Sequence, residues 1–417
     1  MYRLYGDGIH DDWPAIQTMI DSGTCQVILP APKKHYLISR PLELPSFFQL
    51  TLPRYATVRL ADNANCVMVK NKMKPDPACR LSPEAYENPV QSHLWGYVDD
   101  YAPDAPCENI TLEGGIWDCN NEGQLPNPEQ AKERPVREQY GCGMLFYNVK
   151  HLTLRSLTVK DPSQYAVTLD TVSDFTVEDI TFDFNLGNPY PINMDGIHLD
   201  GNCHYGDIRN LKGTCYDDFV AINAHEGSRG DITHITVDGL YADYCHSAVR
   251  LLTVSQRVHH IHITNVHGNF YQYVVGLTKY YPGETTGSFD AITVDNIYAA
   301  KALPVRKGAF QHPPAGKPRD QLPYLYVQRN TRTGFLTVRD LHRREETLLK
   351  DTLTIGKNAR IDNLSFENVS VTNGTGEKMT FITNRGSIGC LTLRNVDCGD
   401  DEMLRNEDGG SVDQIVK

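Results

Sequence analysis

The sequence lacks the long apolar runs and leader-like segments that mark membrane and exported proteins. No stretch among its 417 residues approaches the length needed to span a bilayer, and the opening residues 1–6 have no signal-peptide character. A cytoplasmic protein is therefore expected, or a secreted one from which a leader has been removed. Aromatic residues make up only 9% of the chain and charged residues 22%, proportions that fit an ordinary globular protein.

The 11 cysteines lack the spacing of a metal site or a disulfide framework, because they form no CxxC pair and their number is odd. His259, His260 and His262 have a zinc-like spacing, but strand alternation would send the first two to opposite faces, which favours a structural role. We therefore expect no metal and no cofactor. Four cysteines are expected as small, buried apolar side chains: Cys66, Cys142, Cys203 and Cys215.

Positive charge is scarce relative to negative charge. The 40 Lys and Arg residues are outnumbered by 52 Asp and Glu, and the net charge of −12 argues against nucleic acid or an anionic membrane as the main partner. An anionic sugar polymer is not excluded, because a local Arg or Lys can bind a carboxylate within an acidic protein. The composition predicts no particular oligomeric state.

A strand-like pattern of six residues recurs five times along the chain. In each copy the third and fifth residues are aliphatic, which is the alternation of a strand with one buried face. The steps between successive copies are 30, 23, 29 and 26 residues. The copies begin at Tyr165, Asp195, Asp218, Ser247 and Tyr273.

Repeats of this length predict a solenoid in which each coil covers the apolar face of the next. Propeller blades repeat at about 40–50 residues, longer than these steps, so a parallel β-helix is the better interpretation. We expect one all-β domain over residues 1–417. Two long excursions from the coils are predicted, at residues 71–107 and 303–356, where the pattern is interrupted.

The start of the chain predicts a short helix that caps the open end of the solenoid. Asp11 or Asp12 can act as the N-cap, and Pro14 falls in the first turn, where its missing N–H does no harm. Ile16 and Ile20 share one helical face and can cover the first coil.

The repeat concentrates acids at one position of the coils. It places Asp195 beside Asp218, with Asp217 and His246 one position earlier on adjacent coils. Carboxylates crowded in this way repel one another, so at least one keeps its proton near neutral pH. A protonated acid and an ionised carboxylate are the pair that glycoside hydrolysis needs. The alternative is that these aspartates only form turns at strand starts.

Several of these residues resemble the motifs of a known group of proteins. Gly6–Gly8, Asp11–Asp12 and Ala15–Gln17 resemble the N-terminal signature of the pectate-lyase-like right-handed parallel β-helices. Asn193–Gly196 and Asp217–Asp218 resemble the NTDG and DD motifs of the polygalacturonase family, glycoside hydrolase family 28. The resemblance covers most of the chain as architecture and about 80 residues as catalytic motif.

The resemblance implies an inverting glycoside hydrolase that acts on a pectin-related or other acidic polysaccharide or oligosaccharide. Asp217 would protonate the leaving group, and Asp195 and Asp218 would activate water. His246 would correspond to the family's histidine. The chain departs from the family at the substrate-gripping Arg-Ile-Lys motif, where it has residues 275–279, and at Phe219, where the family has cysteine.

Other residues are expected to contact the sugar. His198 and Arg250 fall at the same outward position of neighbouring coils and can line a groove, although a solvated face would show the same pattern. The complete set of expected substrate contacts is Asn193, His198, His225, Arg250, Lys279 and Tyr281.

Two other functions fit the same features. A β-helix polysaccharide lyase would eliminate rather than hydrolyse, and its acid cluster would hold Ca²⁺. A non-catalytic glycan-binding or tailspike-like module would share the N-terminal signature without the chemistry.

Overall fold

The computed structural model describes residues 3–72, 106–125, 142–188, 191, 193–280, 285–303 and 322–417. The chain divides into two compact units. Unit 1 contains Met1–Tyr216 with Glu226–Arg229, and unit 2 contains Asp217–His225 with Gly230–Lys417. The prediction of one continuous domain stays a prediction.

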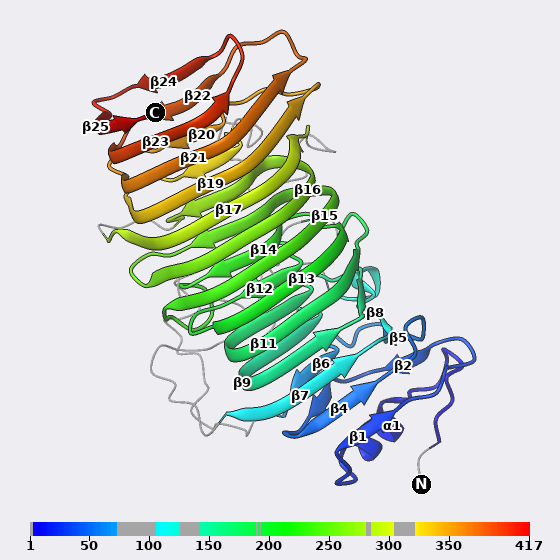
Figure 1. The fold of residues 1–417 in the computed structure, drawn as a ribbon. Coiled ribbons are helices and arrows are strands. Elements are labelled where there is room, and N and C mark those ends of the chain that lie inside the picture. Colours follow the sequence, from blue (N-terminus) through cyan, green and yellow to red (C-terminus); the bar gives the residue numbers. More distant parts are fainter. Residues whose placement is uncertain are drawn as a thin grey trace. The chain divides into compact units, whose positions relative to one another are not determined.

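Unit 1 contains two short helices and thirteen described strands (Figure 1). In chain order they are α1 (Trp13–Ile20), β1 (Gln26–Ile28), β2 (Tyr36–Ile38), β3 (Leu42–Leu44), β4 (Phe48–Thr51), β5 (Thr57–Leu60), β6 (Val69–Asn71), β7 (Cys107–Glu113), β8 (Ile116–Asp118), the 3₁₀ helix η1 (Asn121–Gly123), β9 (Met144–Arg155), β10 (Thr158–Lys160), β11 (Val167–Asp183), β12 (Ile197–Leu199) and β13 (His204–Thr214).

Unit 2 contains twelve described strands. They are β14 (Asp218–Asn223), β15 (Ile232–Leu252), β16 (Arg257–Thr278), β17 (Gly287–Lys301), β18 (Leu325–Val327), β19 (Thr331–Glu345), β20 (Leu353–Ile355), β21 (Arg360–Asn373), β22 (Thr380–Asn384), β23 (Ser387–Asp397), β24 (Glu402–Asn406) and β25 (Ser411–Val416).

Both units are right-handed parallel β-helices, so the predicted fold class is confirmed. In unit 1, β11 pairs in parallel with β9, β10, β12 and β13. In unit 2, β16 pairs in parallel with β15, β17 and β18. Within each unit, a residue therefore lies beside the residue one coil earlier and the residue one coil later.

The core of unit 2 is an aliphatic column that runs from coil to coil. Ile235 lies opposite Ile261, and Ile261 lies opposite Ile292. The column continues through Leu336 and Leu364, and all five side chains are buried. Each buried side chain of this kind contributes about 1.5–3 kcal/mol relative to an exposed one, so the column holds neighbouring coils together.

Left-handed residues turn the corners of the coils. Asn265 and Asn296 have φ of 57° and 51°, a conformation that asparagine tolerates better than most residues. Their amides also link the coils: Asn296 donates a hydrogen bond to Asn265, which donates to Asp238 at 2.6 Å. The same arrangement recurs where Asn368, with φ of 54°, donates to Asp340 at 3.1 Å.

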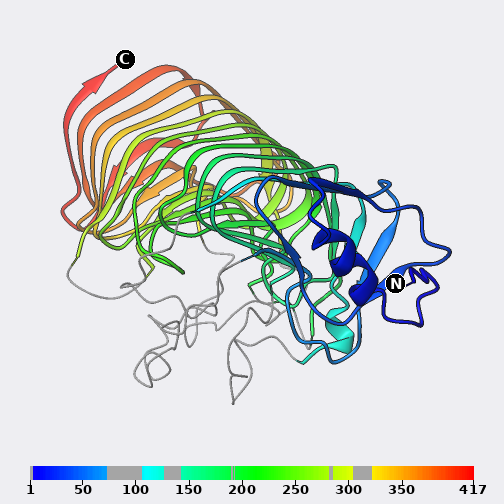
Figure 2. The ribbon, with the colours of Figure 1, turned by 90° about the horizontal axis from the view of Figure 1, so that it is seen from below.

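The predicted capping helix is present as α1, which lies across the first coils of unit 1 (Figure 2). Trp13 Nε1 donates to the Pro41 carbonyl at 2.8 Å, and the Gln17 side chain bonds both backbone groups of Glu43, at 3.0 and 3.2 Å. Asp12 is the N-cap residue, but its carboxylate accepts from the backbone of the preceding loop rather than from the helix.

The predicted excursion at residues 303–356 is wrong for its second half. Residues 325–355 form β18, β19 and β20 and pair in parallel with the coils on either side. In β19 the buried Leu336, Val338 and Leu341 keep the aliphatic signal, but the many arginines of the strand obscure it. Residues 304–321 lie outside the described residues, as do residues 73–105 of the excursion predicted at 71–107.

Other composition-based expectations can be placed on the structure. Cys142, Cys203 and Cys215 are buried as predicted, whereas Cys66 is only half-buried. Neither helix in the described part of the chain combines the length and apolar character needed to cross a lipid bilayer.

We expect Ile292→Ala to lower the free energy of unfolding by about 2–5 kcal/mol, because it opens a cavity in the aliphatic column. Thr293→Ala, one residue along the same strand on its half-exposed side, is the matched control. Denaturant titration followed by circular dichroism measures both. Equal loss of stability in the two variants would contradict the column as the source of coil cohesion.

Candidate active site

Unit 2 brings together four of the residues predicted for the active site: Asp217, Asp218, His246 and Arg250. Asp218 is the first residue of β14, a strand buried along its whole length, and Asp217 comes directly before it. The parallel neighbour β15 places Ser247 opposite Asp218, so His246 arrives beside the acid pair.

Each of the four side chains lies within contact distance of at least one other, and Ser247 adds a fifth polar group. His246 Nδ1 lies 3.1 Å from Asp217 Oδ1 and 3.7 Å from Asp218 Oδ1. Arg250 Nε lies 2.8 Å from Asp218 Oδ2. Ser247 Oγ donates a hydrogen bond to Asp218. The two acids are therefore not equivalent, because the guanidinium and the hydroxyl are both on Asp218.

The contacts with Arg250 and Ser247 lower the pKa of Asp218. Burial alone would raise the pKa of this carboxyl, but the Arg250 guanidinium, His246 and Ser247 outweigh burial and hold the pKa below its ordinary value. Asp218 is thus an ionised carboxylate at neutral pH.

Aromatic rings enclose the histidine. The Tyr271 ring meets His246 edge to face with centroids 4.9 Å apart, and Tyr273 approaches it at 6.2 Å. Tyr244 stacks on Tyr271 at 5.3 Å. Burial, helped by the negative charge of Asp217, raises the pKa of Tyr271 well above its ordinary value, so its phenol keeps its proton.

The acid pair and the histidine could also hold a cation. One oxygen each from Asp217 and Asp218 and one nitrogen of His246 lie within 4.8 Å of one another, the one such trio in the described parts of the chain. Two carboxylates with an imidazole suit zinc better than calcium, which prefers about six to eight oxygen ligands. The prediction of no metal stays a prediction.

Unit 1 holds the third predicted acid, Asp195, in a second buried cluster. His198 Nδ1 lies 2.7 Å from Asp195 Oδ2, and His198 Nε2 lies 3.3 Å from Asp200 Oδ1 and 3.5 Å from Glu226 Oε2. The imidazole stacks on Tyr165 with centroids 3.8 Å apart and planes at 14°. Both ring nitrogens therefore face carboxyl groups, which together with the stacking fix the direction of the imidazole.

The turn Glu226–Arg229 packs against this cluster. Gly227 has φ of 60°, and a Cβ there would lie 2.4 Å from Asp200 Oδ2, so only glycine fits. The next backbone N–H, that of Ser228, donates to Asp170 Oδ2 at 3.0 Å. Burial raises the pKa of Asp170 to about 6 and that of Asp200 well above its ordinary value.

The remaining predicted contacts lie in different surroundings. His198 was expected to line a groove, but its side chain is fully buried among the acids described above. His225 is nearly buried, with Nδ1 3.1 Å from Gln256 Oε1. Lys279 is mostly buried, and burial lowers its pKa. Asn193 sits in a left-handed turn with φ of 49°, and Tyr281 lies outside the described residues.

The predicted repeat register is confirmed within each unit. Asp218 pairs with Ser247, and Ser247 with Tyr273, as the aligned copies require. The copies that begin at Tyr165 and Asp195 are also in register, through the pair Val167 and Ile197. The predicted closeness of Asp195 and Asp218 joins the two units and stays a prediction.

Sequence reasoning missed several residues that carry these clusters. Ser247 starts a repeat copy and could have been found from its register with Asp218. Asp170 and Asp200 both end a copy, so they too share a register. Tyr271 carried no sequence signal, because it lies outside the repeated segments.

The expected separation of His259 and His260 is wrong. Their Nδ1 atoms lie 2.7 Å apart, because His260 takes a positive φ of 56° and interrupts the strand alternation. His260 also stacks on His234 of the preceding coil with centroids 4.7 Å apart.

Comparison with known proteins supports the resemblance seen in the sequence. The model of glycosyl hydrolases family 28 matches residues 104–246, a segment that includes all three predicted acids and ends at His246. Plasmin and fibronectin-binding protein A of Streptococcus pneumoniae (strain ATCC BAA-255 / R6) is 29% identical over 199 residues, which are 46% of this chain and 24% of that protein. The match thus spans about a quarter of that relative's length.

Two solved structures show the shared fold. The endo-xylogalacturonan hydrolase from Aspergillus tubingensis has a TM-score of 0.58 at 13% identity and covers 97% of this chain and 98% of its own. The family 28 exopolygalacturonase of Yersinia enterocolitica has a TM-score of 0.57 at 12% identity, over 98% of this chain and 76% of its own. The chain is therefore similar to the family 28 glycoside hydrolases and has the right-handed parallel β-helix of their superfamily.

The buried acids of unit 1 predict a stability that falls as the pH rises. A carboxyl whose pKa is higher in the folded than in the unfolded chain stabilises the fold at low pH and loses that contribution as the pH rises through the folded value. For Asp170, with a pKa of about 6, the loss falls between about pH 4 and pH 7 and amounts to about 3 kcal/mol.

Asp170→Asn should flatten this part of the pH dependence. Asp183→Asn, on the same strand β11 but with a side chain that is 64% exposed, should leave it unchanged. Urea unfolding at a series of pH values measures the effect. A wild-type stability that rises across this range would contradict the burial of protonated acids.

Proposed function

We propose that the protein is a glycoside hydrolase that cleaves a pectin-related or other acidic polysaccharide or oligosaccharide, with inversion at the anomeric carbon. The observation that carries the proposal is the asymmetric acid pair of unit 2, in which Arg250 and Ser247 bind Asp218 while His246 stands closest to Asp217. The family 28 match over residues 104–246 supports the same chemistry.

In this proposal the two acids of the pair have different tasks. Asp218, held ionised by Arg250, acts as a base toward the attacking water. Asp217 delivers a proton to the departing oxygen, and a carboxyl that must keep a proton is well placed beside one that has already lost it. His246, 3.1 Å from Asp217 Oδ1, fixes the direction of that carboxyl.

Asp195 is the second proposed base, and unit 1 holds it through His198. The imidazole is fixed by stacking on Tyr165 and by acids at both nitrogens, so it offers Asp195 a rigid donor. We assign His198 a positioning role for Asp195 in place of the predicted contact with substrate, because its side chain is fully buried.

The acidic nature of the substrate rests on the likeness to family 28. Arg250 is proposed to contact the sugar with the part of its guanidinium that does not face Asp218, since its side chain is 15% exposed. The chain has no Arg-Ile-Lys motif, and Lys279 is mostly buried. Recognition of a uronate carboxylate would therefore use other residues than in the family.

A polysaccharide lyase is the first competing function. Asp217, Asp218 and His246 include a nitrogen donor, which argues against a calcium site of the kind such a lyase uses. Incubation with polygalacturonate in the presence and absence of a chelator separates the two. Hydrolysis releases reducing ends whether or not the chelator is present, whereas products that absorb in the ultraviolet and vanish with the chelator identify a lyase.

A binding module without catalysis is the second competing function. It is favoured by the 29% identity to a protein named for binding plasmin and fibronectin, although the match covers 24% of that protein. Binding of fibronectin or of glycans, together with no new reducing ends across a broad glycan panel, would support this function against the hydrolase.

We expect Asp217→Asn to reduce turnover by at least about a hundredfold, because the amide keeps the size of the carboxyl but cannot deliver a proton. The melting temperature and substrate binding should stay close to those of the parent protein. An aryl glycoside with a good leaving group should be partly spared. Reducing-end assays with both substrates measure the effect, and near-parental turnover on the natural glycan would remove Asp217 from the role of acid.

His198→Gln should lower kcat with little change in KM and move the acidic limb of the pH–rate profile to higher pH. The amide can still donate to Asp195 but lacks the ring that stacks on Tyr165, so the ionised form of Asp195 loses a rigid hydrogen-bond donor. His10→Gln, an exposed histidine of unit 1 with a 57% exposed side chain, is the control. A purely structural histidine would lower the melting temperature and leave the profile in place.

A further inference from the structure

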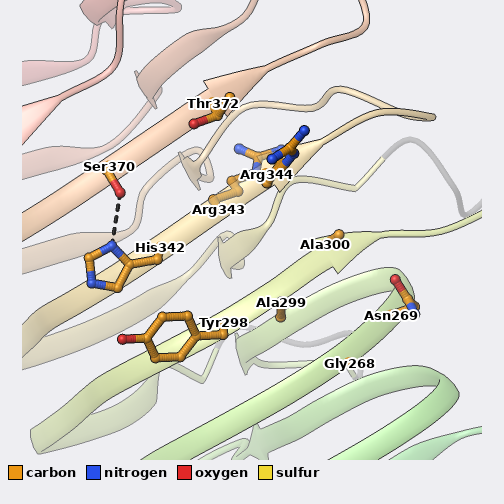
Figure 3. A pocket seen from close by; sticks show the side chains of 10 residues that line it. All are labelled: Gly268, Asn269, Tyr298, Ala299, Ala300, His342, Arg343, Arg344, Ser370 and Thr372. Carbon is orange, nitrogen blue, oxygen red and sulfur yellow. Dashed lines mark hydrogen bonds between the residues drawn. The ribbon is translucent and has the colours of Figure 1, made fainter.

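Unit 2 carries a hollow on the outer side of its coils that shares no residue with the candidate active site. It has a volume of about 460 Å³ and is lined from four successive strands, β16, β17, β19 and β21 (Figure 3). Pockets that bind small molecules commonly measure about 300–1,000 Å³, so this one can take a short oligosaccharide.

The hollow forms at small residues, Gly268, Ala299 and Ala300, whose neighbours in the lining have larger side chains. Ala300 lies opposite Asn269 of the preceding coil and leaves a gap in the outer row of side chains. Gly268 forms part of the floor, and a Cβ there would lie 2.2 Å from the Ala242 carbonyl oxygen. Gly268 therefore stays without a side chain, and its backbone forms that part of the lining.

One wall of the pocket is aromatic. Tyr298 and His342 occupy the same position of successive coils and stack with centroids 4.9 Å apart. They end a column that begins with Tyr241 and His267, in which the rings follow one another at 5.3 Å. Tyr298 is 47% exposed and is held by stacking on both faces, so its ring is available to a ligand in a fixed orientation.

The column stops at the pocket. In the next coil the same position holds Ser370, whose hydroxyl bonds His342 Nδ1 at 2.9 Å. The change from a ring to a small hydroxyl residue leaves space beside a rigid aromatic edge. It also adds one polar group to that edge.

The opposite wall is polar and includes one exposed arginine. Asn269, Arg344 and Thr372 line the side of the hollow away from Tyr298 and His342 (Figure 3). The described residues that line the pocket include no aspartate or glutamate, in a chain whose net charge is −12. The positive charge at the hollow comes from Arg343 and Arg344, which pair with Glu345 and Glu346.

Arg344 is the residue of the lining that can bind an anionic ligand group. Its side chain is 77% exposed and pairs with Glu346, which is itself 57% exposed, at 2.8 Å. Exposed pairs of this kind contribute about 0.2–1 kcal/mol, so exchanging Glu346 for a ligand carboxylate costs little. Its neighbour Arg343 is instead buried and bonded to Glu345 at 2.6 Å, which anchors the strand beneath the pocket.

From these features we propose that the pocket binds a uronic-acid oligosaccharide as an accessory site. Arg344 binds the carboxylate through paired N–H groups, Asn269, Ser370 and Thr372 bond the hydroxyls, and the apolar side of the sugar ring lies against Tyr298. The site goes beyond the proposed hydrolysis, since binding here requires no catalytic residue. It would hold a polymeric chain against unit 2 whether or not that chain is cleaved.

The test is isothermal titration of the full chain with a galacturonate trimer and with the neutral galactose trimer. The chain carries Asp217→Asn, so that the probe is not consumed. Ala300→Phe fills the hollow, and Arg344→Gln removes its charge. Arg332→Gln is the control, since Arg332 lies on the same strand, has a side chain that is 66% exposed and pairs with Asp362.

We expect Ala300→Phe to remove one acidic-trimer site per chain and Arg344→Gln to weaken that site about tenfold, with no change in Arg332→Gln. The neutral trimer should bind at least about tenfold more weakly than the acidic one. Unchanged binding in Arg344→Gln, whose exposed side chain is not needed for folding, would overturn the proposal. So would equal affinity for both trimers, or no binding of either. None of these outcomes depends on whether the parent protein hydrolyses glycans.

Discussion

Parallel stacking of the coils decides which residues of each unit lie side by side. It puts every residue beside its counterpart one coil away, so each kind of side chain builds a column of its own. The isoleucine and leucine column from Ile235 to Leu364 gives cohesion, and the asparagine pairs around Asn265 and Asn368 fix the corners. A change at one coil is therefore felt by the coils on both sides.

The same stacking brings buried carboxyl groups of neighbouring coils close together. Carboxylates at neighbouring positions of stacked coils repel one another. The two clusters reduce this repulsion in different ways. In unit 2, Arg250 lies on Asp218 and keeps it ionised. In unit 1 a single imidazole, His198, stands among several acids, and burial raises the pKa of Asp170 and Asp200. Asp218 therefore carries a fixed negative charge, whereas Asp170 and Asp200 keep their protons to a higher pH than ordinary aspartates do.

The fold could be predicted from the sequence because its signal is repetitive. The alternation of aliphatic residues and the length of the repeat steps together predict the register of Asp218 with Ser247 and Tyr273, which the strand pairing confirms. The signal failed where charged residues occupy a regular strand. Arginines such as Arg339 and Arg343 made β19 look irregular, although its aliphatic residues are buried in the normal alternation.

The candidate site was predicted in part, for a similar reason. Register alone gathers Asp217, Asp218 and His246, because they lie at or next to equivalent positions of neighbouring coils. Arg250 lies opposite Ala221 instead, and its long side chain reaches Asp218. Register does not tell which side chains are covered. His198 was expected on an open groove and is buried, since Tyr165 stacks on its ring and the turn that contains Glu226 folds over it. Left-handed residues such as His260 also break the alternation on which side-chain directions were predicted.

We propose that the acids of this β-helix hydrolyse a glycosidic bond rather than eliminate across it or merely bind the sugar. Proton NMR of the first products formed from polygalacturonate tests this most directly, because the anomeric signals are recorded before mutarotation. We expect a new reducing-end signal whose configuration is opposite to that of the cleaved linkage, with no vinylic proton. A vinylic signal, a retained configuration or an unchanged spectrum from each pectic polymer supplied would contradict it.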